Sequence, residues 1–588
     1  MTEFVGSTGD FSPPLAVGSS RKTAEAIANS MKRHREDWED HYRELEDYLQ
    51  PRRGLFNGGA PADRQRSKRG KKVNHKMLDS TPMRALRVLK SGMQSGMTNP
   101  ARRWFRWTPA DREKREFHTV KEFLAKAEDE AQALLRTGFY RAFHTSYGDL
   151  GTYGHEAAII EDHPTKLLRI TQLVPGSFWM GSMDGDVVDI LYREPLLTVN
   201  EIVGRFVFGN NLDGTPDWNA VTADVKRCFD AGDGSKQRTV KQLIHPRFDF
   251  DPRSKRKQDR PIASLYWMDD LKGDRYMDDS GFKENPISAS RWETVGNEVY
   301  SRSPGMEALP DIKELMDKRR DFAEMLKRVN RPPMNAPVSL RSSAFSLLPD
   351  AVNFLADPNQ GIKPAYQIDP RFGELRQDIE SSKNDVWAAM YADLFLMISS
   401  LDRRQITATE IGERVEEKLI AIGPVVDRLG SEKHEPMLDR IFNKLLLSGR
   451  LGTPPPELES ETLEVDFISM LAQAQRAVAT GAVERLWSFA GNLGAVKPDI
   501  LDKLDEDQTI EEYADMLGTS PSLLRSDDEV QAIRASRQQI QQAMQAADSA
   551  AKLAPAVNQA TQAAETLSRA DQPRGNQPAD ILRRVGIG

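Results

Sequence analysis

Helical spacing of apolar residues is clearest in the middle of the chain. Between Ala308 and Val329, apolar side chains recur at three- and four-residue steps, with lysines and arginines between them. This spacing predicts an amphipathic helix. The same periodicity returns from Phe372 to Leu396, which predicts a second helix.

Prolines interrupt the stretch between these two predicted helices, at Pro332, Pro333, Pro337, Pro349, Pro358, Pro364 and Pro370. Proline lacks an amide donor and disfavours helical geometry in the residue before it. A helix that leaves a body, an irregular excursion and a returning helix together predict a protruding arm between residues 304 and 396. Because one copy leaves the apolar stripe of this arm half exposed, we expect neighbouring copies to cover it.

Outside the arm, the pattern predicts a helix-rich α+β body. Amphipathic helices are expected near 22–49, 80–99, 117–135 and 437–447. Short β-prone segments bounded by turn residues predict strands near 168–174, 178–180, 187–192, 240–244, 262–267, 287–292 and 465–468. A chain of 588 residues also exceeds the usual size of one core, so we expect several subdomains.

Two local motifs favour packing over ligand binding. Gly92 and Gly96 lie four residues apart on a predicted helix too polar for a membrane, so we expect close packing against another backbone. Trp104, Phe105 and Trp107 form an aromatic strip that is expected to belong to the core.

Composition limits the function classes. With 39% hydrophobic and 29% charged residues, the chain is expected to be soluble, and no stretch approaches the roughly 20 apolar residues of a membrane span. The N-terminal residues lack a basic segment before an apolar run, so neither secretion nor membrane insertion is expected. A net charge of -7 argues against tight wrapping around nucleic acid. The single cysteine, Cys228, excludes an intrachain disulfide and is expected to be a small buried residue.

Motifs for catalysis and cofactors are absent from the sequence. There is no phosphate-binding loop, no His-Glu-x-x-His and no Gly-x-Ser-x-Gly. We therefore expect no enzyme, no cofactor and no metal. Asp184 and Asp186, with Glu194, leave a metal-dependent nuclease open as an alternative, although carboxylates at a turn are usually solvated. His34 and His41 are expected to face solvent.

Four segments in order along the chain carry a family resemblance: Leu-Lys-Ser-Gly-Met-Gln-Ser-Gly-Met-Thr-Asn-Pro-Ala-Arg-Arg-Trp-Phe at 89–105, Tyr-Arg-Glu at 192–194, Ser-Arg-Ser-Pro-Gly-Met-Glu-Ala-Leu-Pro-Asp-Ile-Lys at 301–313, and Ile-Thr-Ala-Thr-Glu at 406–410. Together they resemble the head-to-tail connecting, or portal, proteins of short-tailed, T7-like bacteriophages over roughly 25–480. The family often has Gly-Arg-Gly-Pro-Gly-Met where this chain has Ser-Arg-Ser-Pro-Gly-Met, a departure that affects a turn.

The resemblance implies a portal fold assembled as a ring, usually of twelve copies, at one capsid vertex. DNA would enter the head through its channel during packaging and leave at infection. The implied division is a disordered N-terminal arm (1–20), a wing of helices and a β-rich module (21–303), a first stem helix (304–331), a clip (332–369), a second stem helix (370–396), a tunnel loop (397–407), returning wing helices (408–520), a crown or barrel helix (521–570) and a disordered tail (571–588).

The resemblance also implies partners and site residues. Arg403 and Arg404 in the tunnel loop are expected to face DNA, with salt bridges between subunits as the alternative. The clip is expected to dock the terminase motor and later the tail adaptor or nozzle proteins, through Pro332, Pro333, Pro337, Phe345 and Phe354.

Further implied partners are the major capsid and scaffolding proteins, and double-stranded DNA that passes without sequence specificity. No membrane partner is expected. The protein would belong to the virion after assembly in the host cytoplasm. A head-completion or tail-adaptor ring is the alternative structural class, although such adaptors are usually much shorter.

Overall fold

The computed structural model describes residues 20–57, 76–115, 117–183, 185, 187–209, 215–336, 338, 362–365, 372–401, 421–458, 462–468, 486–492, 508–510, 530–542 and 544. The chain forms two compact units, Met1–Ala482 and Val483–Gly588. In the part that the structure describes, no helix is both long and apolar enough to cross a membrane.

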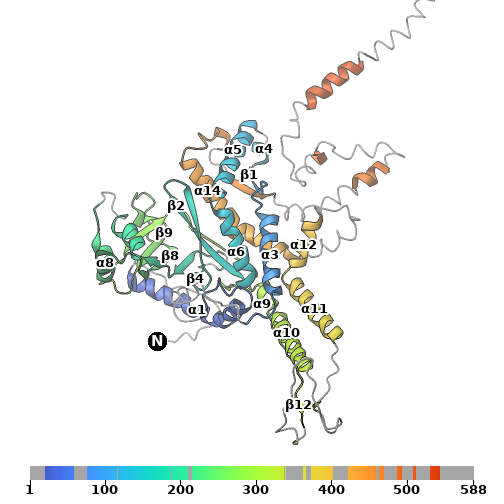
Figure 1. Cartoon of the computed structure of the whole chain (residues 1–588). Coiled ribbons are helices and arrows are strands. Elements are labelled where there is room, and N and C mark those ends of the chain that lie inside the picture. Colours follow the sequence, from blue (N-terminus) through green and yellow to red (C-terminus); the bar gives the residue numbers. More distant parts are fainter. Residues whose placement is uncertain are drawn as a thin grey trace, which may run out of the picture. The chain divides into compact units, whose positions relative to one another are not determined.

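A five-stranded antiparallel sheet lies at one side of the first unit (Figure 1). Its strand order is β10 (Asp278–Phe282), β9 (Ile262–Trp267), β8 (Lys241–Pro246), β5 (Ile190–Arg193) and β4 (Phe178–Gly181). Helix α1 (Arg21–Tyr48) packs its apolar residues Ala24, Ile27 and Met31 against Trp179 and Leu265 on one face of this sheet.

A second sheet covers the opposite face. It orders β11 (Ile287–Arg291), β2 (His155–His163) and β3 (Leu167–Gln172), all antiparallel. Ile159 and Ala289 of this sheet share one cluster with Phe178, Leu191 and Ile244 of the first. Because successive strand residues point to opposite faces, the five-stranded sheet is buried on both sides.

Helices form the largest core of the first unit. They are α3 (Thr81–Met97), α5 (His118–Leu135), α6 (Phe139–Tyr153), α12 (Ala392–Leu401) and α14 (Glu435–Leu447), beside the short α4 (Arg112–Arg115). A two-stranded sheet of β1 (Phe105–Pro109) and β14 (Leu463–Phe467), together with the 3-10 turn η7 (Pro456–Leu458), accompanies them. The aromatic strip is core, as predicted: Trp104, Phe105 and Trp107 are buried in this cluster.

A smaller cluster surrounds Cys228, which is buried and free, as expected. Its elements are β6 (Leu196–Thr198), α7 (Val199–Ile202), the π-helical η1 (Val203–Val207), the 3-10 turn η2 (Trp218–Ala220), α8 (Ala223–Asp230) and β7 (Gln237–Thr239). Another 3-10 turn, η3 (Lys257–Asp259), contacts β10.

Several elements were not predicted from the pattern, among them α6, β2 and α8. Helix α6 contains Gly148 and Gly151, and glycine lowers helix propensity. In the folded chain an added Cβ at Gly151 would lie 2.5 Å from Cδ2 of Leu89, so this glycine allows α6 to approach α3. The expected solvent-facing position of His34 is also wrong, because its ring is partly buried and stacks on Tyr300 at 6.0 Å between centroids.

The second unit is described only in short segments. Residues 486–492, 508–510 and 530–542 are helical, and the last of these is almost wholly exposed within this unit. The rest of the predicted crown helix, 521–570, lies outside the described residues.

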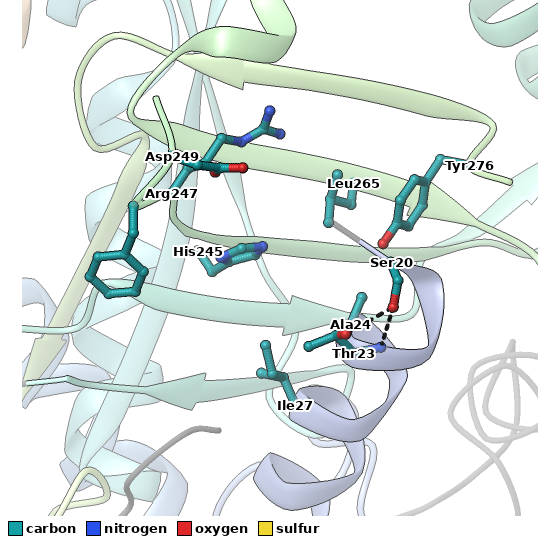
Figure 2. Close-up of a pocket in the computed structure, with 10 residues that line it drawn as sticks. Ser20, Thr23, Ala24, Ile27, His245, Arg247, Asp249, Leu265 and Tyr276 are labelled. Atoms are coloured by element: carbon teal, nitrogen blue, oxygen red, sulfur yellow. Dashed lines mark hydrogen bonds between the residues drawn. The ribbon is translucent and has the colours of Figure 1, made fainter. Parts of the chain in front are cut away.

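One small pocket lies between the N-terminus of α1 and the five-stranded sheet (Figure 2). Figure 2 shows Ser20 and Thr23 joined by hydrogen bonds at its edge, with His245 and Tyr276 on the sheet side. Its volume of about 10 Å³ has room for roughly one water molecule. It is therefore too small to bind an organic ligand.

Candidate functional site: the helical arm

The predicted arm is present as a pair of antiparallel helices, α10 (Leu309–Asn330) and α11 (Phe372–Ala389) (Figure 1). The short helix α9 (Pro304–Glu307) precedes α10, and Ser303 caps α9 by accepting a hydrogen bond from the Met306 amide at 3.0 Å. The Ser303 hydroxyl also donates to the Thr152 carbonyl at 2.8 Å. The start of the arm is thereby fixed to the end of α6.

The first two turns of α10 belong to the body. Leu309, Ile312, Leu315 and Met316 are buried in the main helical core. Farther along the helix, the apolar stripe continues through residues that stay partly exposed: Phe322, Met325, Leu326 and Val329. The arm therefore emerges from the core while its sequence pattern remains amphipathic.

An ion pair fastens the arm where it leaves the body. Arg319 Nε lies 2.6 Å from Asp79, whose side chain is largely buried. Asp79 also accepts hydrogen bonds from the amide and hydroxyl of Thr81 at 2.8 and 2.6 Å. Burial alone would raise the pKa of Asp79, but these hydrogen bonds and the Arg319 guanidinium together lower it below the usual range. One carboxylate thus joins the start of α3 to the arm.

Contacts between α10 and α11 extend partway along the arm. Lys318 Nζ lies 2.9 Å from both Asp378 and the Ser382 hydroxyl, and 2.6 Å from Glu314. Farther out, the Phe322 ring meets Phe372 edge-on, with centroids 6.1 Å apart. These contacts hold the two helices together from the root as far as Phe322.

A short antiparallel pair joins the chain beyond the two helices. Strand β12 (Met334–Asn335) pairs with β13 (Lys363–Pro364), and the Ala365 amide donates to the Pro333 carbonyl at 2.8 Å. Pro332 is partly exposed and Pro333 is exposed, so both can meet a partner. The other predicted docking residues, Pro337, Phe345 and Phe354, lie outside the described residues.

The predicted second stem helix, 370–396, is two helices rather than one. Between α11 and α12, Tyr391 adopts a left-handed conformation with φ of 52°. A bulky residue rarely adopts this conformation, which breaks the helix here. The Tyr391 ring contacts Trp292, with centroids 5.9 Å apart. The break redirects the chain from the arm into the body.

Helix α12 enters the body beside α3. An added Cβ at Gly92 would overlap the ring of Phe395, so the glycine motif provides close packing, as predicted, but against a side chain rather than a backbone. The helix ends at Leu401, so 397–401 of the predicted tunnel loop are helical. Arg403 and Arg404 lie outside the described residues.

The carboxylates that left a nuclease open do not form a described metal site. Asp184 and Asp186 lie outside the described residues. Glu194 accepts hydrogen bonds at 2.6 Å from both the Lys32 ammonium and the Tyr192 hydroxyl. Among the residues that the structure describes, no three His, Cys, Asp or Glu side chains are grouped so that they could hold a metal ion.

Sequence reasoning missed the contacts that fix the arm. Nothing in the local pattern distinguishes Lys318 or Arg319 from the other cations of α10, because their partners Asp378 and Asp79 lie far away in sequence. Ser80 or Thr81 as a cap, with Pro82 in the first turn, predicts the start of α3 but gives no sign of the contact between Asp79 and the arm. Knowledge of which helices pack together would be needed to find these pairs.

Comparisons with known proteins give a consistent result. The family model described as bacteriophage head to tail connecting protein matches residues 21–524. A probable portal protein of Bordetella phage BPP-1 is 35% identical over 575 residues, covering 97% of this chain and 99% of the relative. A portal protein of Salmonella phage epsilon15 is 32% identical over 520 residues, covering 88% and 91%.

Among solved structures, a chain from the virion of a native gene transfer agent particle matches with a TM-score of 0.30 at 14% identity, covering 73% of this chain and 93% of the other. This likeness is too weak to place any element.

Proposed function

Because this chain belongs to the bacteriophage head-to-tail connecting protein family, we propose that copies of its arm line a channel for double-stranded DNA. Its function is that of a portal, the connector between a phage head and its tail. The two relatives named as portal proteins match along most of their length, which disfavours the shorter head-completion or tail-adaptor class. Neither is named as a nuclease.

The observation that carries the proposal is the uncovered apolar stripe of α10. Met325, Leu326 and Val329 lie beyond the Phe322–Phe372 contact and remain partly exposed in a single copy. Full burial of such a side chain contributes about 1.5–3 kcal/mol. A neighbouring copy would supply that burial, and repetition of one such contact around an axis closes a ring.

The ring proposed here has twelve copies and stands at one capsid vertex of the virion, after assembly in the host cytoplasm. At -7 per chain, twelve copies carry 12 × -7 = -84. The mean field of a ring with this net charge repels the phosphate backbone, so duplex can slide without being held. Major capsid and scaffolding proteins would surround the ring.

The outer end of the arm is the proposed dock for the terminase motor and then for tail adaptors. Exposed Pro333 and the β12–β13 pair support this role, because they stand farthest from the core along the arm. Deletion of residues 339–361 should abolish association of purified ring and motor in a pull-down, while the ring still forms. Unchanged association would remove the docking role from this segment.

Arg403 and Arg404 are proposed to guide DNA, because their positive charges follow directly after α12. Replacing both with alanine should slow packaging in a motor-driven DNA protection assay while the ring stays intact. Normal packaging by such a ring would assign these arginines to contacts between subunits or to solvent instead.

Ring formation itself can be tested on the arm. The double variant Met325→Asp/Leu326→Asp should stay monomeric in sedimentation velocity, because two charges replace the apolar contact. Lys327→Asp is the matched control: it changes the net charge by the same -2 on the same helix, at an exposed position, and should assemble.

Particles of wild-type protein viewed down the axis by electron microscopy should be closed rings. A wild-type chain that remains monomeric at all concentrations would refute the channel. A double variant that assembles like wild type would refute the arm contact alone.

A further inference from the structure

A second concave surface lies on the body, away from the arm helices. It is a pocket of about 380 Å³ between the start of α6, the β2–β3 turn and strand β3. That volume far exceeds the roughly 10–15 Å³ that one water needs, so the pocket can hold a group larger than a simple ion.

The pocket is lined by cations and by no carboxylate. Arg141 comes from the first turn of α6, Lys166 from the β2–β3 turn and Arg169 from β3. All three side chains are exposed, and the structure gives none of them an ion pair with another described residue. Arg53, at one edge of the pocket, forms an ion pair with Asp149 at 2.8 Å. Three cationic residues thus line one cavity that no carboxylate lines; the register partner of Arg169 on β2 is Glu161, which pairs with Arg205.

The positions of these cations are set by the fold. His163 Nδ1 accepts hydrogen bonds from the amides of Thr165 and Lys166 at 3.3 and 3.2 Å, which shapes the turn. Leu167, with φ of 63°, ends this turn and packs against the main core. Lys166 thus extends from a turn that is anchored on both sides, and Arg169 from the strand that follows it.

The start of α6 adds to the positive potential. The helix has 15 residues, no side-chain cap and no acidic residue in its first turn. The N-terminal end of a helix carries partial positive charge, which acidic residues usually offset. Here a cation, Arg141, occupies that turn. The like charges repel one another unless an anion joins them.

We propose that this pocket binds a phosphate group, either in the backbone of double-stranded DNA or in a free polyphosphate. Donors reach the cavity from a helix, a turn and a strand, and so from several directions. The tetrahedral oxygens of phosphate can accept from all of them, whereas a planar carboxylate offers two oxygens in one plane. This assignment rests on the pocket alone and does not require the ring or its channel.

The test compares two full-length variants of equal charge change. Lys166→Gln/Arg169→Gln removes two pocket cations. Lys272→Gln/Arg275→Gln removes two exposed cations from the β9–β10 loop, which likewise have no ion pair with a described residue. Unchanged thermal unfolding and sedimentation would show that both variants are folded and assembled as the wild type is.

Titration calorimetry with tripolyphosphate should show binding to wild type that falls by at least about tenfold in the pocket variant and by less than about twofold in the control. With a short labelled duplex, the slope of log affinity against log salt should decrease by about 2 in the pocket variant only. If the pocket variant loses affinity for the duplex, the phosphate that the pocket binds belongs to DNA. If it loses affinity for tripolyphosphate alone, the ligand is a free polyphosphate.

Two outcomes would overturn the proposal. Equal losses of affinity in the pocket variant and the control would mean that the anion is attracted by the overall charge of the protein and does not bind in the pocket. Competition by poly-glutamate as strong as that by tripolyphosphate, at equal charge, would mean that the pocket accepts acidic protein segments. The sedimentation test of the arm is independent of both results.

Discussion

The body and the arm differ in how far their ion pairs and apolar side chains are buried. In the body, Lys433 and Glu156 form an ion pair with both side chains at 0% exposure. Ser290 donates to Glu156 at 2.7 Å, and Gln172 donates to it at 2.9 Å. In the arm, Lys318 meets Asp378 with side chains that are 25% and 53% exposed, and the apolar stripe beyond it remains uncovered.

The difference separates what one copy can complete from what needs another. The body buries charges within a single chain and compensates each with hydrogen bonds, which buried ions require. The arm places its ion pairs in solvent, where they stabilise little, and leaves apolar surface at its outer half. The described ion pairs of the body are therefore completed within one chain, whereas the outer half of the arm keeps an apolar stripe that one chain leaves partly exposed.

The largest effect should come from breaking the buried pair. Lys433→Met removes the ion-pair partner of the buried Glu156 and should lower the free energy of unfolding by about 3–5 kcal/mol in urea denaturation. Lys236→Met removes an exposed partner of Asp233 and should leave the free energy of unfolding nearly unchanged. Equal effects would show that burial does not distinguish the two pairs.

The contact between α3 and α12, where the chain returns from the arm to the body, should be the next most sensitive to substitution. Gly92→Ala places a methyl group in the Phe395 ring and should destabilise by about 1–3 kcal/mol through overpacking. Gly373→Ala, in the arm helix α11, meets no atom within 4 Å and should be neutral or stabilising, by up to about 1 kcal/mol. Thermal unfolding of both variants measures this contrast, and a stable Gly92→Ala would mean that α12 can shift.

Lowering the pH should destabilise the fold of the body before that of the arm. Burial lowers the pKa of His155 and of His434 to about 3, with Arg35 and Lys433 adding to the effect. The unfolded chain takes up these protons near pH 6.5, so stability is complete above that pH and is lost as the pH falls from 6.5 towards 3. Each histidine contributes a slope of up to about 1.4 kcal/mol per pH unit.

Urea denaturation at several pH values tests this prediction. His434→Gln should reduce the slope by about one proton, whereas His41→Gln, on a half-exposed side chain, should reduce it less. Helices α10 and α11 contain no histidine. An unchanged slope in His434→Gln would mean that this imidazole does not drive the acid response.

The smallest effect is expected at the arm root. Arg319→Gln removes the partner of Asp79 and should cost no more than about 1 kcal/mol, because Arg319 is partly exposed. Faster hydrogen exchange of the amides around Arg319 and at the start of α3 would report the loosened root. Arg320→Gln, whose partner Asp317 is exposed on the same helix, should leave that exchange unchanged. The Asp79 contact is present above the usual aspartate pKa and is lost only below it.

The arm was predictable because local rules decide it. Helical spacing over 309–330 and 372–389, with proline between, needs no tertiary information. Strand β9 was predicted with its observed bounds, since turn residues flank a β-prone run. Helix α6 was missed because its glycines lower propensity, and their compensation is packing against α3.

The buried network could not be predicted for a related reason. Glu432, Lys433 and His434 are consecutive and all buried, which no amphipathic α-helix pattern allows. They lie in a π-helical turn at Gly430–His434 that is surrounded by other elements, so that Glu432 meets Arg291, Lys433 meets Glu156 and His434 meets the Trp104 ring. Their partners Arg291 and Glu156 are remote in sequence, so the pattern alone gives no sign that these charges are paired.

The amino-acid sequence by itself determined the out-and-back arm, the helix-rich α+β class and the family, because periodicity, proline placement and ordered motifs are local properties. Only the tertiary structure decided where the arm is fastened, that Tyr391 divides its returning helix, and that Arg141, Lys166 and Arg169 share one cavity. Those features depend on which distant segments meet, and that is settled by packing of the whole chain.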